Sequence, residues 1–240
     1  MTGMFRLVDV FSSLQGEGAR AGWPATFIRL AGCNLACPWC DTDVKEKFAL
    51  STRELLDKVA HFHNRFVVIT GGEPSVVPNL EELVDALHRH GRVVALETNG
   101  VRAAPCAEKF DYIAVSPKAD YAKRYLDTVM LRRADEVRIV ATGEDIAPFC
   151  RRMRELVKAR RYYISPLERD GKIHYHRAVK LLLRLNRNRF TGMKDVRGET
   201  GENTSPFPPW ARCFRRAGGS LCRAWSAIPA ALWWTWPWQH

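Results

Sequence analysis

The segment "RFVVITGGEPSVVPNLEELVDALHRHGRVVALETNG", residues 65–100, has the pattern of one strand–helix–strand unit. The short β-branched run at 65–70 predicts a buried strand, and apolar residues at helical spacing over 79–91 predict a helix. A second apolar run at 92–98 predicts the next strand. A connection of this kind is expected to place the two strands parallel in one sheet, with a right-handed crossover.

Capping residues mark where the helices begin and end. Asn79 and Glu82 mark the start of the helix in this unit, and Gly91 directly follows its end. The preceding helix begins at Ser51, which can cap it, and Glu54 completes a capping box with Ser51. Both helices therefore have predicted starts that agree with their apolar periodicity.

The same alternation continues on both sides of this unit. Further strands are predicted at residues 5–11, 25–31, 111–116, 136–141 and 162–165, and further helices at 51–64, about 145–159 and from about 174. Strands that alternate with helices are typical of an α/β fold with a mostly parallel sheet. We therefore expect one α/β domain over residues 1–189.

The composition fits such a domain. Of 240 residues, 46% are hydrophobic and 26% are charged, as in ordinary globular proteins. No apolar run reaches the roughly 18 to 20 residues that a membrane-spanning helix needs, and the N-terminus lacks the features of a secretory signal. We therefore expect a cytoplasmic protein, in which a close-spaced group among the seven cysteines indicates metal binding rather than disulfides.

The last part of the chain has a different composition. From about Phe190 it is rich in Arg, Pro, Gly, Ala and Trp, and it ends in "AALWWTWPWQH", which has neither helical nor strand periodicity. We expect residues 190–240 to form an irregular or disordered tail. An interfacial membrane role for the aromatic end is the alternative.

Unusual residues follow four of the predicted strands. The segment "CNLACPWC" follows the second strand, and "GGEP", "TNG" and "SPK" follow the next three. Because the carboxyl ends of parallel strands meet at one edge of the sheet, ligands usually bind there. We therefore expect these four segments to form one active site.

Cys33, Cys37 and Cys40 have the spacing C-x-x-x-C-x-x-C. Three thiols within eight positions are too concentrated for packing alone, unlike Cys106 and Cys150, which we expect to be buried apolar residues. Soft thiolates suit an iron–sulfur cluster, which normally has four protein ligands. With three thiolates, one iron would stay open to a small molecule.

A zinc site is the alternative metal centre. Zinc would need a second C-x-x-C or a pair of histidines to complete its ligands. His61 and His63 are available, but they fall on a predicted helix without a C-x-x-C partner. The iron–sulfur interpretation therefore fits the sequence better.

The cysteine spacing, with Trp39 directly before the last cysteine, resembles that of the radical S-adenosylmethionine superfamily. The resemblance implies that three cysteines hold a 4Fe-4S cluster and that S-adenosylmethionine binds its open iron. It implies one-electron cleavage to a 5′-deoxyadenosyl radical, which does the chemistry without a catalytic side chain. It also implies an incomplete (β/α) barrel of the radical SAM type over residues 1–189.

A narrower resemblance depends on several motifs together. The segments "LQGEG", "TFIRLAGCN", "WCDTD", "TGGEP", "ETNG" and "SPKAD" resemble, in matching order, the 7-carboxy-7-deazaguanine synthase family over about residues 5–186. This resemblance implies a lyase that converts 6-carboxy-5,6,7,8-tetrahydropterin to 7-carboxy-7-deazaguanine with loss of ammonia, in queuosine and 7-deazapurine biosynthesis. It also implies Mg²⁺ as a cofactor, a flavodoxin-like or other reductant and a homodimer, without nucleic-acid or membrane partners.

The resemblance assigns roles to individual residues. It implies that Cys33, Cys37 and Cys40 hold the cluster and that Thr42 binds Mg²⁺, an ion that prefers oxygen ligands. The implied contacts with S-adenosylmethionine are Trp39, Cys40, Asp41, Gly72, Glu73, Ser116, Pro117, Lys118, Ser165, Pro166, Leu167 and Glu168, although the last four depart from a Gln-Pro form in the family. The implied contacts with the pterin are Leu14, Gln15, Gly16, Arg29 and Thr70, with Arg29 on the substrate carboxylate.

The end of the chain departs from the family. Nothing beyond about residue 190 matches the family's final strand or its Gln-x-His-Lys stretch, which approaches the substrate. Our hypothesis is a change of reading frame near residue 190, because the composition switches abruptly there. A lineage-specific extension is the alternative, and an intact frame in independent isolates would reject the hypothesis.

Two other functions compete with this interpretation. A glycyl-radical activating enzyme shares the radical chemistry but acts on a protein, and the L-Q-G-E-G motif and Thr42 argue against it. A metal-dependent nucleic-acid-binding module would use the net charge of +11, although no dense basic stripe stands out in the body of the chain. Salt-dependent RNA binding without cleavage of S-adenosylmethionine would favour that module.

Overall fold

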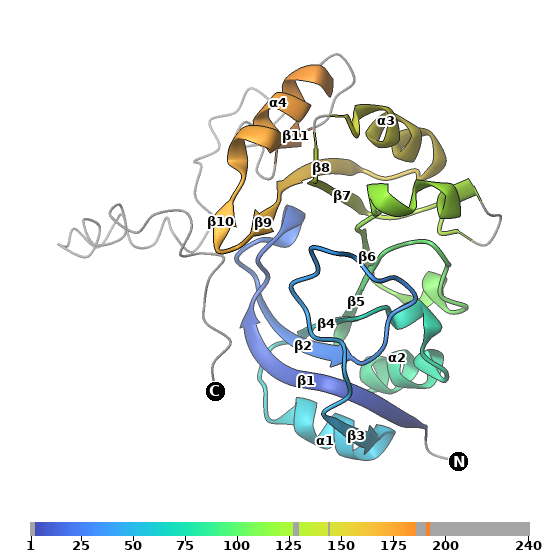
Figure 1. The fold of residues 1–240 in the computed structure, drawn as a ribbon. Coiled ribbons are helices and arrows are strands. Elements are labelled where there is room, and N and C mark those ends of the chain that lie inside the picture. Colours follow the sequence, from blue (N-terminus) through green and yellow to red (C-terminus); the bar gives the residue numbers. More distant parts are fainter. Residues whose placement is uncertain (1–2, 127–129, 144, 186–190, 193–240) are drawn as a thin grey trace, which may run out of the picture.

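A computed structural model describes residues 3–126, 130–143, 145–185 and 191–192. Among these residues, one nine-stranded sheet has the order β11-β8-β7-β6-β5-β4-β2-β1-β3. Figure 1 shows the sheet curving around the centre of the molecule, with the helices outside the curve. Apart from residues 191–192, the predicted tail and the proposed change of reading frame lie outside the described residues.

Most of the sheet is parallel. The parallel strands are β2 (Pro24–Leu30), β4 (Phe66–Gly71), β5 (Val93–Thr98), β6 (Tyr112–Val115), β7 (Glu136–Ala141), β8 (Arg161–Pro166) and β11 (Thr191–Gly192). β1 (Met4–Leu14) pairs antiparallel with both β2 and β3 (Phe48–Ser51). A hairpin of β9 (Glu168–Arg169) and β10 (Lys172–Ile173) follows β8. The predicted α/β class and mostly parallel sheet are confirmed.

Each predicted helix is present, and the first three are shorter than their predicted ranges. The α-helices are α1 (Thr52–Ala60), α2 (Leu80–Arg89), α3 (Ala147–Leu156) and α4 (Tyr175–Leu185), and the 3₁₀ segments are η1 (Gly18–Arg20), η2 (Pro74–Val76), η3 (Ala107–Lys109) and η4 (Ala119–Leu126). None of the helices in the described part of the chain is long and apolar enough to cross a membrane.

Both predicted helix starts are confirmed. The capping box of Ser51 and Glu54 has both of its hydrogen bonds. Helix α2 begins directly after Asn79, although Asn79 is left-handed (φ 59°) and its side chain makes no capping hydrogen bond. The Glu82 carboxylate instead accepts from the Thr52 hydroxyl at 2.6 Å. Glu82 therefore makes a tertiary hydrogen bond to Thr52 of α1 instead of a hydrogen bond at the start of its own helix.

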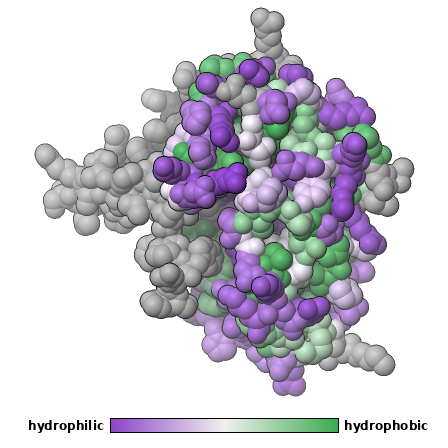
Figure 2. Space-filling model, in the orientation of Figure 1, coloured by the Kyte–Doolittle hydropathy of each residue, from purple (hydrophilic) through white to green (hydrophobic). Residues whose placement is uncertain are grey.

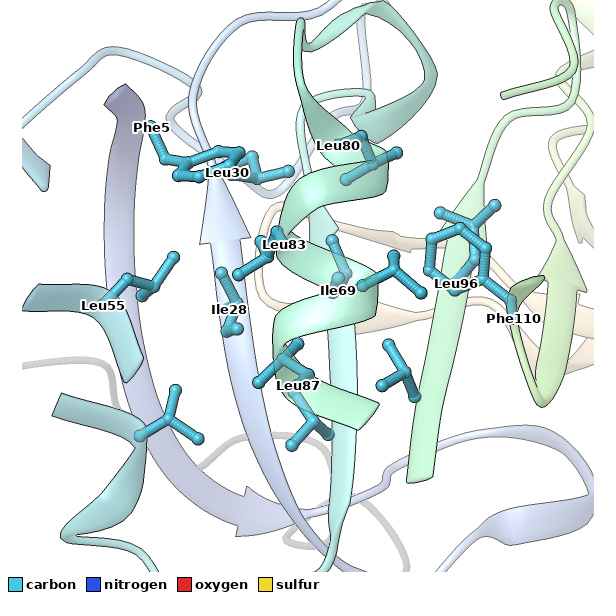
Figure 3. Packing of buried hydrophobic residues seen from close by; sticks show 14 of the residues in the cluster. Phe5, Ile28, Leu30, Leu55, Ile69, Leu80, Leu83, Leu87, Leu96 and Phe110 are labelled. Carbon is cyan, nitrogen blue, oxygen red and sulfur yellow. The ribbon is translucent and has the colours of Figure 1, made fainter. Parts of the chain in front are cut away.

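The core lies mainly between the helices and the convex face of the sheet. In Figure 3, α2 lies over the strands and runs along them, and its Leu83 and Leu87 pack toward Ile28 and Ile69. A second cluster joins α3 and α4 to β7 and β8, and Cys150 is buried in it. Cys106 is buried in the first cluster, as predicted. Burying one face of each helix in this way is the main source of stability for such short helices.

The concave face of the sheet changes from apolar to polar along the strands. Its apolar half is a third cluster, made of Ala25, Phe27, Phe66, Val68, Ala95, Tyr112 and Ala114. Side chains alternate between the two faces of a strand, so the next concave positions are Arg29, Thr70, Glu97 and Ser116. The carboxyl ends of the parallel strands therefore present polar groups on the inner side.

Candidate active site

The loop between β2 and β3 carries the three clustered cysteines, and it is the blue loop in front of the sheet in Figure 1. A hydrogen bond of 2.9 Å from Gly32 N to Val44 O closes the loop, and Cys40 N donates to Cys37 O at 3.1 Å. Cys33 and Cys37 are half-buried, and Cys40 is exposed.

The environment of the thiols shows that they share one region. Burial raises the pKa of Cys33, and the charges of Glu73 and Cys40 raise it further. Burial also raises the pKa of Cys37. The charge of Lys118 lowers this pKa, and the charges of the other two cysteines raise it further. Cations are therefore needed nearby to favour the thiolate forms, because each thiolate disfavours the next.

The Gly-Gly-Glu-Pro loop after β4 lies directly against the cysteine loop. A Cβ on Gly71 would overlap the backbone at Leu30, and a Cβ on Gly72 would overlap the backbone at Gly32 and lie 3.0 Å from the Cβ of Cys33. The backbone N–H of Glu73 donates to the carbonyl of Gly32 at 2.9 Å. Two glycines are therefore required for this close approach.

The Glu73 carboxylate joins this loop to the Thr-Asn-Gly turn after β5. It is completely buried and accepts hydrogen bonds from Ser75 N (3.0 Å), Thr98 Oγ1 (2.6 Å) and Asn99 N (2.7 Å). Asn99 in turn donates from its side chain to the Asn34 side chain at 2.8 Å. Protein donors thus occupy the carboxylate, and its contact with S-adenosylmethionine stays a prediction.

The Ser-Pro-Lys segment after β6 completes the same edge. Lys118 Nζ donates to Ser116 Oγ at 2.7 Å and lies 5.2 Å from the centre of the Trp39 ring. Burial lowers the pKa of Lys118, and the charges of Cys37, Glu17 and Asp41 oppose that change. The four segments that follow the strands therefore meet at one edge of the sheet, as the sequence predicts.

Arg29 and Thr42 connect the concave face to the cysteine loop. Arg29 Nη1 donates to Thr42 Oγ1 at 3.0 Å, and Thr42 Oγ1 donates to Asp41 Oδ1 at 3.1 Å. The predicted carboxylate-binding arginine and the predicted magnesium ligand are thus neighbours. An oxygen-rich site beside a guanidinium can bind both a hard cation and an anionic group.

The loop between β1 and β2 approaches the concave face from the opposite end of the strands. Gln15 is buried, and its Nε2 donates to Glu97 Oε1 at 2.9 Å. Arg138 Nη1 donates to the same carboxylate at 2.8 Å, and its guanidinium also pairs with Glu136 and, at 3.7 Å, with Glu17. Three carboxylates therefore surround one guanidinium inside the curve of the sheet.

These carboxylates differ in their protonation. Burial raises the pKa of Glu17, and the opposing charge of Arg138 does not offset that rise. For Glu97, burial also favours the neutral form, but Arg138, Gln15 and Thr70 together lower the pKa. Of these two carboxylates, Glu17 therefore takes up a proton more readily than Glu97.

The remaining predicted residues lie at the ends of their strands. Ser165, Pro166, Leu167 and Glu168 stand at the carboxyl end of β8, separated from β6 by β7. The Ser165 hydroxyl is buried without a hydrogen-bond partner, which leaves it able to accept a ligand. Leu14 is 47% exposed at the end of β1, and Gly16 is also exposed next to Gln15.

Several polar residues of the site were missing from the sequence prediction. Glu97, Glu136 and Arg138 are charged residues at alternate, inward positions of otherwise apolar strands. That alternation is the pattern that could have identified them, because a charge at a buried strand position needs a partner. The partners themselves come from other strands, so their identity could not be read from the local pattern.

The comparisons with known proteins agree with the fold. The family model of the Radical SAM superfamily matches residues 27–158. This match, over more than half of the chain, places it in the Radical SAM superfamily.

Two curated relatives have the name 7-carboxy-7-deazaguanine synthase. The protein from Neisseria meningitidis serogroup B is 43% identical over 182 residues, covering 76% of this chain and 84% of the relative. The protein from Haemophilus influenzae is 42% identical over the same length and coverage. The crystal structure of QueE from Escherichia coli superposes with a TM-score of 0.60 at 25% identity, covering 79% of this chain and 92% of that one. The chain belongs to the 7-carboxy-7-deazaguanine synthase family.

The cysteine loop fits the 4Fe-4S cluster that radical SAM enzymes contain, together with S-adenosylmethionine. Its donor set is three thiols on one short loop, with Cys40 exposed at the edge. Within the part of the chain that the structure describes, no three His, Cys, Asp or Glu side chains are grouped to hold a metal ion. A cluster binds each thiolate through a separate iron, whereas zinc gathers four ligands around one ion. The superfamily to which the chain belongs therefore favours the cluster over the zinc alternative.

Proposed function

We propose that this chain converts 6-carboxy-5,6,7,8-tetrahydropterin to 7-carboxy-7-deazaguanine with loss of ammonia, as a carbon–nitrogen lyase of queuosine and 7-deazapurine biosynthesis. The observation that carries the proposal is the continuity of two surfaces, because Arg29 Nη1 contacts Thr42 Oγ1 at 3.0 Å. That contact joins the polar concave face to the loop of the three cysteines. Neither a protein-activating enzyme nor a nucleic-acid-binding module is favoured by the family to which the chain belongs.

In this proposal the edge of the sheet holds the cluster and S-adenosylmethionine. Cys33, Cys37 and Cys40 would be the thiolate ligands. When bound, the cluster and S-adenosylmethionine supply the one-electron chemistry that starts the reaction. Trp39 and Lys118, which lie against each other, would orient the cofactor, and the Ser165 hydroxyl has free hydrogen-bonding capacity for it.

The concave face would hold the pterin. Arg29 can pair with the substrate carboxylate through its guanidinium. Gln15 and Thr70 stand beside Glu97 on the same face, so they can bind the polar ring edge. The apolar half of that face, with Phe27 and Val68, lies below them and excludes water. Exclusion of water strengthens each polar contact with the substrate.

Thr42 is the proposed Mg²⁺ ligand. Its hydroxyl lies between Arg29 and Asp41, which places an oxygen-rich site next to the proposed carboxylate contact. A divalent cation there could orient substrate oxygens and stabilise negative charge.

The remaining proposals follow from the family resemblance. We propose a flavodoxin-like or other one-electron reductant, a homodimer and a cytoplasmic location. We also propose that residues 1–189 are the functional domain and that residues 190–240 are an appended tail.

Cluster loading in the absence of oxygen tests the ligand assignment. The wild-type chain should bind about four irons and release 5′-deoxyadenosine from S-adenosylmethionine when a reductant is added. Cys37→Ala should yield a defective cluster and no cleavage. Cys106→Ala removes a buried thiol of the first core cluster, outside the loop, and should bind the cluster normally. Full cleavage by Cys37→Ala would contradict the assignment.

Mg²⁺ dependence tests Thr42. Thr42→Val removes the hydroxyl but keeps the shape, so product formation should need at least tenfold more Mg²⁺. Thr42→Ser keeps the hydroxyl and should remain close to the wild type. An unchanged Mg²⁺ requirement in Thr42→Val would remove this residue from the proposed metal site.

A further inference from the structure

The 3₁₀ segment η4 (Ala119–Leu126) follows the Ser-Pro-Lys segment and lies along the cysteine loop. Three of its side chains make one hydrogen bond each to that loop. Trp39 Nε1 donates to Asp120 Oδ2 at 2.8 Å. The two other contacts join Ala36 N to the Tyr121 hydroxyl at 3.0 Å and Arg124 Nη1 to the carbonyl of Asn34 at 3.1 Å.

Each of these three contacts falls on a loop residue directly next to one of the cysteines. The contacted loop residues are Asn34, Ala36 and Trp39, which directly adjoin Cys33, Cys37 and Cys40 in the sequence. Each cysteine therefore has one neighbour that is fixed to η4. Two of the contacts hold backbone atoms beside Cys33 and Cys37, and the third holds the Trp39 indole beside Cys40.

Apart from η4, other segments hold the cysteine loop near its two ends, at Gly32, Asn34 and Thr42. No helix or strand is assigned between the end of β2 at Leu30 and the start of β3 at Phe48. Each residue that is held in a single conformation costs entropy, so a loop of this length needs external contacts to keep three thiols in one arrangement.

The segment η4 is itself attached to the rigid part of the fold. Tyr125 is buried, and its hydroxyl donates to the carbonyl of Asn99 at 2.8 Å while accepting from Lys118 N at 2.9 Å. The backbone of η4 is non-helical at Tyr121 (φ −112°, ψ 25°), so the segment is an irregular connection rather than one continuous helix.

We propose that η4 is a clasp that fixes the cysteine loop in the arrangement that binds the cluster. Its positioning residues are Asp120, Tyr121 and Arg124, none of which is expected to touch the cluster, S-adenosylmethionine or the pterin. The clasp slows loss of the cluster because it prevents the three thiols from separating. This inference rests on the cluster site proposed above.

The test measures how fast the loaded chain loses iron to a chelator in the absence of oxygen, together with the unfolding midpoint of the same sample. Tyr121→Phe removes one hydroxyl and should speed iron loss about fivefold, as expected for one lost hydrogen bond. Combining it with Asp120→Ala and Arg124→Ala should speed the loss about a hundredfold if the three contacts add. Asp120→Asn keeps an acceptor for Trp39 and should stay within about twofold of the wild type.

Lys123→Ala is the matched control, because Lys123 is exposed on the same segment. It should change neither the rate of iron loss nor the unfolding midpoint. The clasp variants should lose iron faster while unfolding at the same midpoint as this control, which a general loss of stability would not produce. Iron loss at the wild-type rate in the triple variant overturns the clasp alone. A wild-type chain that binds no cluster overturns the proposed function and the clasp together.

Discussion

Replacing Glu73 with glutamine tests how the edge of the sheet is held together. The Glu73 carboxylate is completely buried, and three protein donors point at its two oxygens. Glutamine has the same shape but turns one acceptor into a donor. In one orientation the new amide nitrogen would face the N–H of Asn99. In the other it would face Ser75 N and Thr98 Oγ1, which share the second carboxylate oxygen in the wild type.

The size of the effect follows from these contacts. Placing the amide nitrogen toward Asn99 sacrifices only one of the three bonds, so it is the cheaper orientation. Losing one hydrogen bond to a charged group costs about 1.5–3 kcal/mol, and the Asn99 N–H is left without a partner in a buried place. We expect the free energy of unfolding of this region to fall by about 3 kcal/mol, which is a large part of the roughly 5–15 kcal/mol of a typical domain.

Native-state hydrogen exchange measures this directly. The amide of Asn99 should exchange about a hundredfold faster in Glu73→Gln than in the wild type, as about 3 kcal/mol implies. Glu108→Gln makes the same chemical change at an exposed position and should leave exchange at Asn99 unchanged. Protection of Asn99 at the wild-type level in Glu73→Gln would refute the role given to the carboxylate.

Three further predictions concern the charged group inside the sheet. Gly18→Ala should lower the free energy of unfolding by at least about 2 kcal/mol. Gly18 has φ +70°, and a Cβ there would overlap the Glu136 carboxylate. A variant that unfolds in urea at the wild-type midpoint would contradict this. Glu17→Gln should match the wild-type melting temperature near pH 4 and exceed it at pH 7.5. The reason is that a carboxyl group with a raised pKa in the folded protein makes the wild type lose stability as pH rises. A variant that melts below the wild type at pH 7.5 would show that the pKa of Glu17 is not raised. Arg138→Met should lose about 3–5 kcal/mol at pH 7 and less at about pH 3, because the stability that comes with the lowered pKa of Glu97 is lost only as pH falls from the unfolded value of about 4.5 toward the folded one; a loss that is equal at both pH values would count against the pairing.

The sequence was sufficient for most of the fold because most elements carry their own periodic pattern. The apolar runs that became β4, β5 and β7 are buried on both faces, and α2 has a continuous apolar stripe. The short strand β3 was missed, since its four residues are defined only by pairing with β1. Pairing between distant segments leaves no local pattern to recognise.

The site residues could be predicted where one segment contains all of them. They could not be predicted where residues of two distant segments contact each other. The three cysteines stand on one loop, so their spacing was informative. The hydrogen bonds of Glu73 to Thr98 and Asn99 span 25 and 26 residues. Such contacts depend on which loops the topology brings together. The same reason explains why the contacts of η4 with the cysteine loop became visible only in the structure.

The most direct test of the account is complete turnover by the purified wild-type chain. The cluster is loaded without oxygen, and S-adenosylmethionine, a reductant, Mg²⁺ and 6-carboxy-5,6,7,8-tetrahydropterin are added. We predict that 5′-deoxyadenosine and 7-carboxy-7-deazaguanine both form, and that 7-carboxy-7-deazaguanine does not form when the pterin is omitted. A chain that carries the complete cluster and forms neither product would contradict this prediction.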